Sequence, residues 1–323
     1  MKVLYFAKEA WEEEYIKSTL QNTEWVAADD PRAEVLSVFV NHPVDAALMA
    51  KYPALKLIAT RSTGFDHIDL AEAKRRGIAV ASVPSYGVNT VAEFAFALLL
   101  ALSRRVCEAA ARVKGGSFSQ AGLTGFDLAG KTIGVVGCGK IGQHLVRMAK
   151  GFDMQVLVSD AHRDEKMAAE LGFTYALLPE LLAQSDVISL HVPYFKETHH
   201  LINKENISKI KKGAYLINTS RGAVVETAAL VQALRDGTLA GAGLDVLEEE
   251  GDMADEMHLL ANGHPKQEEL EVMLENHYLM SHPRVLVTPH VAFDTREALE
   301  RIINTTAENI TAFAAGVPVN LVP

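Results

Sequence analysis

Cysteine is scarce in this sequence of 323 residues, which contains only Cys107 and Cys138. Two cysteines do not make the disulfide framework of small secreted proteins, so we expect a reducing, cytoplasmic environment. Zinc signatures are absent as well, because there is neither an HExxH pattern nor a four-ligand spacing. The neighbouring His199 and His200 are interpreted as part of an exposed loop. We therefore expect no metal site.

Long apolar runs and an excess of positive charge are absent too. The longest apolar run, residues 95–103, is too short to span a bilayer, and the opening MKVLYFA lacks the length and cleavage site of a signal peptide. The formal net charge of −10 offers no attraction to nucleic acid or anionic lipid. We therefore expect a small-molecule partner, and neither nucleic acid nor a membrane.

What the sequence does contain is an alternation of short apolar runs and amphipathic stretches, in two blocks. The first block covers residues 1–90, and the second begins at Lys131. Such alternation predicts an α/β fold with parallel sheets covered by helices on both faces. A chain of 323 residues is longer than a domain with a single hydrophobic core usually is, so we expect two domains. The first block lacks a closing helix, so we expect the last thirty residues to return to it.

The second block opens with a glycine motif. Gly137, Gly139 and Gly142 follow the apolar run TIGVV, and an amphipathic stretch begins among them at Lys140 and Ile141. The glycines allow a tight turn, a close approach of backbone N–H groups to a pyrophosphate, and close packing of the helix. The motif therefore predicts a dinucleotide site. A tight turn without a ligand and the looser glycine loop of methyltransferases are the alternatives.

An acid at the end of the next strand distinguishes between cofactors. Asp160 follows the apolar run QVLVS, where a carboxylate binds the ribose 2′-hydroxyl of NAD and repels the 2′-phosphate of NADP. Arg163 follows closely, and its positive charge weakens the preference for NAD over NADP. NAD is therefore the expected cofactor.

Ionisable residues follow the later apolar runs of the second block. In chain order, the residues at or after the ends of these runs are His191, Arg221, Asp245 with Glu250, and His290. Because the carboxyl ends of parallel strands meet at one edge of a sheet, we expect these side chains beside a bound nicotinamide. The pattern does not choose between the two histidines.

These side chains suit the reduction of a 2-oxo acid by hydride transfer. An arginine supplies two parallel hydrogen-bond donors to the substrate carboxylate. A histidine, which titrates near pH ~6.5, exchanges a proton near neutrality. A glutamate beside the histidine favours the imidazolium form. A surface salt bridge is the alternative interpretation of Arg221.

Six segments follow one another along most of the chain: RSTGFDHIDL (61–70), NTVAEFAFALLLALSRR (89–105), GVVGCGKIGQ (134–143), INTSRGAVV (217–225), GAGLDVLEEE (241–250) and VTPHVAFDTREA (287–298). Together they resemble the D-isomer-specific 2-hydroxyacid dehydrogenases. Tyr86, in PSYGVNT, matches the position where the D-lactate branch of that family carries a substrate-facing tyrosine, with simple packing as the alternative.

The resemblance implies a role for each candidate. Arg221 would bind and polarise the substrate, Glu250 would partner the histidine, and His290 would be the acid/base. His191 then becomes a structural or cofactor-side residue, and Asp245 would approach the nicotinamide carboxamide.

Further contacts are implied for substrate and cofactor. The backbone at Thr63 and Gly64 would hold the substrate carboxylate. Besides the glycines, Asp160 and Asp245, the cofactor-binding residues would be Lys140, Ile141, Thr219 and Ser220.

The resemblance also implies two doubly wound parallel-sheet domains. A flavodoxin-like substrate domain would comprise residues 1–98 and 294–323, and an inserted Rossmann NAD-binding domain would comprise residues 99–293. The Gly/Ser-rich arm at 115–130 would form the contact of a homodimer. A polar insert at 251–284 looks long for the family, and a lid, a dimer element and decoration remain open for it.

The implied activity is an NAD-dependent transfer of hydride between NADH and C2 of a small 2-oxo acid, with pyruvate and D-lactate as the first pair. The alternative is a glyoxylate, hydroxypyruvate or phosphoglycerate enzyme of the same family. A further alternative is an NAD-sensing scaffold similar to the C-terminal-binding corepressors, which keeps the same three catalytic residue types. Slow turnover with tight NADH binding would identify such a scaffold.

Overall fold

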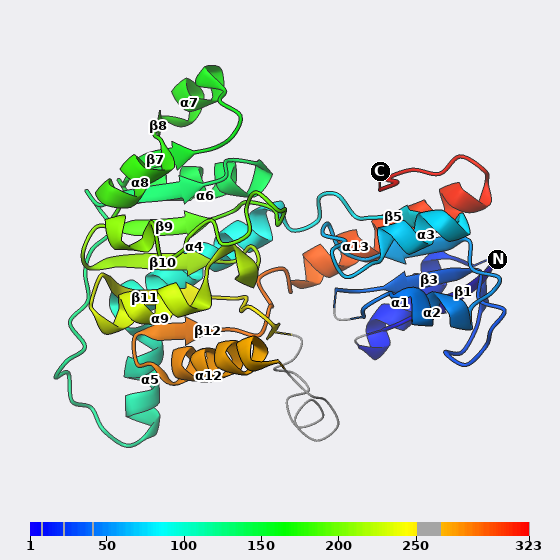
Figure 1. Ribbon diagram of the computed structural model, residues 1–323, viewed down its shortest axis with the longest axis horizontal. Coiled ribbons are helices and arrows are strands. Elements are labelled where there is room, and N and C mark those ends of the chain that lie inside the picture. The colour runs from blue at the N-terminus through cyan, green and yellow to red at the C-terminus, as the bar shows by residue number, and fades with distance from the viewer. Residues whose placement is uncertain (8, 22, 41, 251–265, 323) are drawn as a thin grey trace. The chain divides into compact units, whose positions relative to one another are not determined.

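The computed structural model describes residues 1–7, 9–21, 23–40, 42–250 and 266–322 (Figure 1). The chain divides into two compact units. Unit 1 comprises Met1–Gly87 and Asp294–Pro323, and unit 2 comprises Val88–Phe293. None of the helices in the described ranges is long and apolar enough to cross a membrane.

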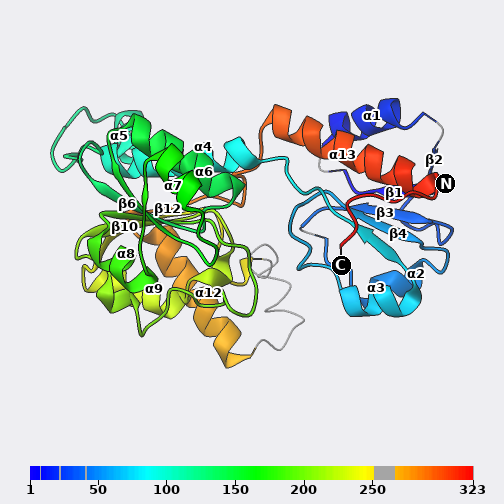
Figure 2. The same ribbon diagram turned by 90° about the horizontal axis from the view of Figure 1, so that it is seen from above.

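Unit 1 is a five-stranded parallel sheet with helices on both faces. The sheet order is β2-β1-β3-β4-β5, which is the flavodoxin-like order. Its strands are β1 (Lys2–Tyr5), β2 (Glu24–Trp25), β3 (Val35–Val38), β4 (Leu57–Thr60) and β5 (Ala79–Ala81). Figure 2 shows one face covered by α1 (Ala10–Thr19) and α13 (Arg296–Ala314), and the other by α2 (Ala46–Lys51) and α3 (Leu70–Arg76).

Local sequence accounts for these elements. All four residues of β3 and all four of β4 are buried, as expected for central strands that are covered on both faces. The side chains of Asp45 and Asp69 cap α2 and α3 by accepting backbone N–H groups of the first turn. Gly77 ends α3 in the left-handed conformation, with φ of +70°.

The C-terminal helix α13 packs in the core of unit 1. Ile303 and Ala307 of α13 share a buried cluster with Ile16 of α1. The tail that follows runs along β5, where the Val322 N–H donates to the Val80 carbonyl at 2.8 Å. The last thirty residues therefore return to the first block of the chain.

Unit 2 is a seven-stranded parallel sheet in the order β12-β11-β10-β9-β6-β7-β8. Its strands are β6 (Thr132–Val136), β7 (Gln155–Ser159), β8 (Thr174–Tyr175), β9 (Val187–Leu190), β10 (Ala214–Asn218), β11 (Leu239–Leu244) and β12 (Val285–Val287). One face carries α4 (Val88–Arg104) and α6 (Lys140–Gly151), and the other carries α8 (Leu178–Gln184), α9 (Thr227–Arg235) and α12 (Gln267–Ser281). The shorter segments are α5 (Val106–Lys114), α7 (Glu165–Leu171), η1 (Ile207–Lys209) and η2 (Gly222–Val224).

The order of the strands in unit 2 reverses between β6 and β9. Strand β6 pairs with β7 on one side and with β9 on the other. In a doubly wound sheet, such a switch point is where the strand ends leave a crevice for a ligand. The predicted fold class, two doubly wound parallel-sheet domains, is confirmed.

The division between the units differs from the one expected at residues 98 and 99. Helix α4 is continuous from Val88, and its Ala95 and Leu99 lie in the core of unit 2 with Ile133 of β6. A Cβ atom on Gly243 of β11 would lie 3.0 Å from Leu98 Cβ. Residues 88–98 therefore belong to unit 2, because the whole apolar face of α4 packs on that sheet.

The polar insert expected at 251–284 contains a regular element of unit 2. Residues 251–265 lie outside the described residues. The remainder forms α12, which packs beside α9, with Met273 and Leu279 buried. Strands β11 and β12 are parallel neighbours, and parallel neighbours require a crossover connection. Helix α12 supplies part of that connection.

Candidate active site

The candidate residues of unit 2 follow strands that share one sheet edge. The glycine loop follows β6, Asp160 follows β7, Arg221 follows β10, Asp245 and Glu250 follow β11, and His290 follows β12. All these strands are parallel, so their carboxyl ends lie at the same edge. Thr63, Gly64 and Tyr86 belong to unit 1.

The glycine loop has the geometry that a pyrophosphate requires. Gly137 has φ of +89°, and a Cβ atom there would lie 2.7 Å from the His191 carbonyl oxygen. A Cβ atom on Gly142 would lie 2.3 Å from the Gly137 carbonyl oxygen. At Gly139, the N-cap of α6, a Cβ atom would meet nothing within 4 Å, and no side chain caps the helix. The N–H groups of the first turn, which begins at Lys140, are therefore arranged to bind an anion.

Asp160, the residue after β7, also holds the glycine loop in place. Its Oδ2 accepts the Cys138 N–H at 2.6 Å, and its Oδ1 accepts the His162 N–H at 2.8 Å. A carboxylate has about four acceptor positions, so capacity remains for ribose hydroxyls. The guanidinium of Arg163 lies over the Tyr175 ring, 5.5 Å from its centre.

The loop after β10 contains a buried polar atom that a ligand would satisfy. The Thr219 Oγ1 is buried and has no hydrogen-bond partner among the residues that the structure describes. Such an atom costs free energy unless it is paired. The buried Asn218 holds the same loop, because its Oδ1 accepts from the N–H and hydroxyl of Ser220 at 3.0 and 2.7 Å. Together with the open N-terminus of α6, this orphaned hydroxyl fits a bound dinucleotide.

His290 and Glu250 form a close pair. His290 Nδ1 lies 2.6 Å from Glu250 Oε1, and Glu250 Oε2 accepts the Leu247 N–H at 3.2 Å. The side chains are 26% and 40% exposed, so the pair is partly open to solvent. A bond at Nδ1 leaves Nε2 as the nitrogen that can face a substrate.

Asp245 holds the loop that carries His290. Its Oδ1 accepts the Thr288 hydroxyl at 2.5 Å and the Val291 N–H at 3.0 Å, and its Oδ2 accepts the Ala292 N–H at 2.7 Å. Burial raises the pKa of Asp245. The carboxylate that was expected to approach the nicotinamide is thus also the anchor of the neighbouring loop. Thr288 was not anticipated, and its only signal is a hydroxyl residue two positions before His290.

The second histidine has a different environment. His191 Nε2 lies 2.8 Å from Ser189 Oγ. Desolvation by the surrounding protein lowers the pKa of His191 to about 4. His191 is therefore neutral at pH 7, while its backbone carbonyl packs against Gly137.

Arg221 lies where the loops after β10 and β11 meet. Its Nη1 donates to the Ser220 carbonyl at 2.9 Å, and its own carbonyl accepts from Asn218 Nδ2 at 2.9 Å. The following Gly222 lies against the next loop, because a Cβ atom there would fall 2.0 Å from the Leu247 carbonyl carbon. The loop of Arg221 therefore contacts the loop that leads to Glu250.

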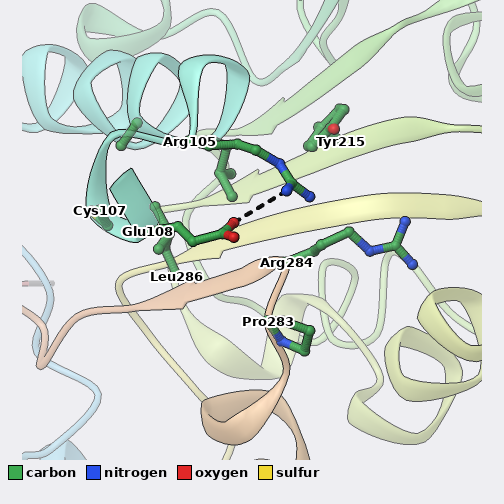
Figure 3. Close-up of a pocket in the computed structure, with 9 residues that line it drawn as sticks. Arg105, Cys107, Glu108, Tyr215, Pro283, Arg284 and Leu286 are labelled. Carbon is green, nitrogen blue, oxygen red and sulfur yellow. Dashed lines mark ion pairs between the residues drawn. The ribbon is translucent and has the colours of Figure 1, made fainter. Parts of the chain in front are cut away.

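A separate pocket lies at the amino ends of the strands (Figure 3). Tyr215, near the start of β10, lines it together with Arg284, which precedes β12. Arg105 and Glu108 form an ion pair of 3.2 Å beside it. This pocket is at the opposite edge of the sheet from the candidate site. Within the described ranges, no group of three or more His, Cys, Asp or Glu could hold a metal ion.

Comparison with known proteins identifies the family. The model of the D-isomer specific 2-hydroxyacid dehydrogenase, NAD binding domain, matches residues 96–292. The chain belongs to the D-isomer specific 2-hydroxyacid dehydrogenases. The predicted cofactor, NAD, and the predicted enzyme class, an NAD-dependent D-2-hydroxyacid dehydrogenase, are thereby confirmed.

Individual relatives carry different names. A glyoxylate reductase of Thermococcus litoralis is 41% identical over 90% of this chain and 83% of its own length. The pyruvate reductase of Chlamydomonas reinhardtii, a solved structure, is 35% identical, with a TM-score of 0.86 and coverage of 99% and 98%. The D-lactate dehydrogenase of Aquifex aeolicus, solved with NAD and lactic acid, is 38% identical, with a TM-score of 0.85 and coverage of 98% and 96%.

Replacing Asp160 by Ala should weaken NADH binding and shift the preference toward NADPH. Loss of a charged hydrogen bond costs about 1.5–3 kcal/mol, so the Kd for NADH should rise at least about tenfold. The Kd for NADPH should rise less, because the repelling carboxylate is gone. Fluorescence titration measures both constants. Equal increases would mean that Asp160 only holds the Cys138 turn, and Glu165→Ala, in the first turn of α7, is the control.

Proposed function

We propose that this dehydrogenase reduces the C2 carbonyl of a small 2-oxo acid to the 2-hydroxy acid, which is the D isomer where C2 is chiral, with Arg221, Glu250 and His290 as catalytic residues. The observation that carries the proposal is the 2.6 Å contact between His290 Nδ1 and Glu250 Oε1, at the sheet edge that also carries the glycine loop. Unit 2 is then the dinucleotide-binding domain, and unit 1 is the substrate domain.

Each proposed catalytic residue has one task. When bound, NADH supplies the hydride for C2. Arg221 binds the substrate carboxylate through its planar pair of donors. His290 donates a proton to the carbonyl oxygen as negative charge develops there, and Glu250 favours the protonated imidazole that this step needs. His191 is unsuited to this task, because its pKa of about 4 leaves it without the proton at pH 7.

The proposed cofactor contacts follow the geometry of unit 2. Gly137, Gly139 and Gly142, with Lys140 and Ile141 in the first turn of α6, would hold the pyrophosphate. Asp160 would bind the ribose. The remaining contacts, toward the nicotinamide side, are assigned to Thr219, Ser220 and Asp245.

Thr63, Gly64 and Tyr86 are the proposed substrate contacts of unit 1. The Thr63 hydroxyl donates to the Val83 carbonyl at 2.8 Å, and the Ser62 hydroxyl donates to the Gly64 carbonyl at 2.6 Å. These bonds hold the turn after β4 in one conformation, which suits backbone that must bind a carboxylate. The Tyr86 carbonyl accepts from Arg301 Nε at 2.7 Å.

Glyoxylate and pyruvate are the proposed substrates. Glyoxylate is supported by the name of the Thermococcus litoralis relative, and pyruvate by those of the Chlamydomonas reinhardtii and Aquifex aeolicus proteins. The two acids differ by one methyl group, and one methyl group in a pocket changes specificity by about 10- to 200-fold. The ratio of kcat/KM for the two acids therefore decides between them.

We further propose that the chain forms a homodimer through α5 and the arm at 115–130, in a cytoplasmic setting. Helix α5 has no buried residue. The side chains of Val106, Val113 and Phe118 are 54%, 45% and 84% exposed, and the proposed contact would cover them. Both Cys107 and Cys138 are free thiols, which suits a reducing compartment.

Replacing Arg221 by Gln should lower kcat/KM for both glyoxylate and pyruvate. The amide cannot supply the charged, bidentate contact, and one such bond is worth about 1.5–3 kcal/mol, or about 10- to 150-fold. The Kd for NADH should stay close to the wild-type value. Steady-state assays with a panel of 2-oxo acids measure the loss. Arg235→Gln, at the end of α9, is the control, and an active Arg221→Gln enzyme would contradict the proposed function.

Replacing Glu250 by Gln should move the pH dependence of reduction. Reduction consumes a proton, so His290 must start protonated and activity falls as the pH rises. Removing the charge of Glu250 makes the protonated form less favourable, and the alkaline fall should move to lower pH. A pH–rate profile with pyruvate and glyoxylate tests this. His191→Gln should keep the wild-type profile, and a Glu250→Gln profile that overlays the wild type would refute the pairing.

Replacing Val113 and Phe118 together by Glu should produce a monomer. Charges at a desolvated contact oppose association. Light scattering at several concentrations measures the mass. Val317→Glu, a substitution at another exposed apolar side chain, should leave the mass unchanged. A dimeric double variant would rule out this surface as the contact.

A further inference from the structure

We propose that Glu248 is a positioning residue: its carboxylate, through His200 and Thr227, fixes the loop that carries Glu250 against the loop that carries Arg221. The inference rests on the proposed function, because it concerns the geometry of residues that we assign to catalysis. Glu248 itself is assigned no contact with substrate or cofactor.

The carboxylate of Glu248 is held by three hydrogen bonds. Its Oε1 lies 2.6 Å from His200 Nε2. Its Oε2 accepts both the backbone N–H and the hydroxyl of Thr227, at 2.8 and 2.6 Å. The side chain is 12% exposed, so the contacts are shielded from water. Charge-assisted bonds in such surroundings are stronger than those on an open surface.

Thr227 is the first residue of α9, and Glu248 takes the place of a local cap there. Glu226 stands at the N-cap but makes no side-chain cap bond. The carboxylate that caps α9 belongs instead to Glu248, which lies in a loop 21 residues further along the chain. A negative charge at a helix N-terminus satisfies an open N–H group and favours the helix dipole. Helix α9 directly follows the loop of Arg221, so this bond ties that loop to Glu248.

His200 also binds the segment that follows Arg221. Its backbone N–H donates to the Ala223 carbonyl at 2.8 Å, two residues after Arg221. The residue has φ of +49°, and its ring stacks on His199 at 3.9 Å. The strained backbone indicates that the surroundings determine the position of His200. Glu248 is therefore linked to the segment that follows Arg221 directly at Thr227 and indirectly through His200.

The backbone of Glu248 is fixed as well. Its carbonyl accepts Asn276 Nδ2 of α12 at 2.8 Å, and Asn276 is fully buried. Gly222 lies so close to Leu247 and Glu248 that a Cβ atom would be 2.3 Å from the Glu248 nitrogen. The two loops therefore pack backbone to backbone at this point.

Two hydrogen bonds connect the loop of Glu248 to His290, the proposed acid/base. The N–H of the preceding residue, Leu247, donates to Glu250 Oε2 at 3.2 Å. Glu250 Oε1 in turn contacts His290 Nδ1 at 2.6 Å. A shift of Leu247 and Glu248 would therefore displace both Glu250 and Arg221. A misplacement of about 1 Å at a catalytic group can cost about a hundredfold in rate.

The experiment compares Glu248→Ala and Glu248→Gln with Glu205→Gln, a substitution at an exposed residue of the same charge. Glu248→Ala should lower kcat/KM for glyoxylate or pyruvate by about 10- to 100-fold. The alkaline fall of its pH–rate profile should move to lower pH, because Glu250 no longer stays beside His290. The Kd for NADH should remain near the wild-type value. Glu248→Gln keeps an oxygen acceptor for Thr227 and should recover most of the activity, and Glu205→Gln should resemble the wild type.

The outcomes separate this inference from the proposed function. If Glu248→Ala lowers only the melting temperature, with unchanged kcat/KM and pH profile, Glu248 is merely a cap of α9 and the inference is wrong. If His290→Ala remains active in the same assays, the proposed function itself fails. Should Glu248→Ala not fold, Thr227→Ala and His200→Ala, which remove the side-chain partners of the carboxylate, decide by the same two readouts. A shifted alkaline fall in either supports the inference, and wild-type values in both overturn it.

Discussion

A buried carboxylate determines where the candidate acid/base stands. Asp245, which is 1% exposed, directly follows β11 and accepts hydrogen bonds from Thr288, Val291 and Ala292 in the loop after β12. Within this loop His290 adopts φ of +53°, a conformation that costs free energy for a residue with a side chain. The bonds to Asp245 offset that cost, because each leaves a buried group satisfied. The direction of the imidazole thus depends on a residue of the neighbouring strand.

Hydrogen bonds and close backbone contacts also join the remaining loops at this edge to one another, in addition to their connection to the sheet. Asn218 holds the turn before Arg221, Gly222 packs on Leu247, and Glu248 ties the next loop to α9. Parallel strands bring these loops to one edge, but a strand end alone leaves a loop free to move. Polar contacts between loops supply the rigidity that a catalytic constellation needs.

The sequence predicted what depends on local pattern. Strand–helix alternation predicted both sheets, and the spacing of Gly137, Gly139 and Gly142 predicted the turn that the backbone adopts. It did not predict that the buried apolar residues of α4 all pack in the core of unit 2, because the apolar pattern of a helix does not specify its partner. Nor did the polar composition of 251–284 reveal the crossover helix α12. The contacts of Glu248 were missed because they join residues 21 and 48 positions apart, and no local pattern records such a distance.

The two histidines have different environments, and these environments suit them to different roles. His191 has a hydroxyl partner two positions away and is desolvated, which lowers its pKa to about 4. His290 has a carboxylate partner 40 positions away and is partly exposed. Desolvation disfavours the charged form of His191, whereas His290 has the Glu250 carboxylate beside its ring. The choice between the histidines therefore rests on solvation as much as on the neighbouring charge, and solvation is a property of the folded chain.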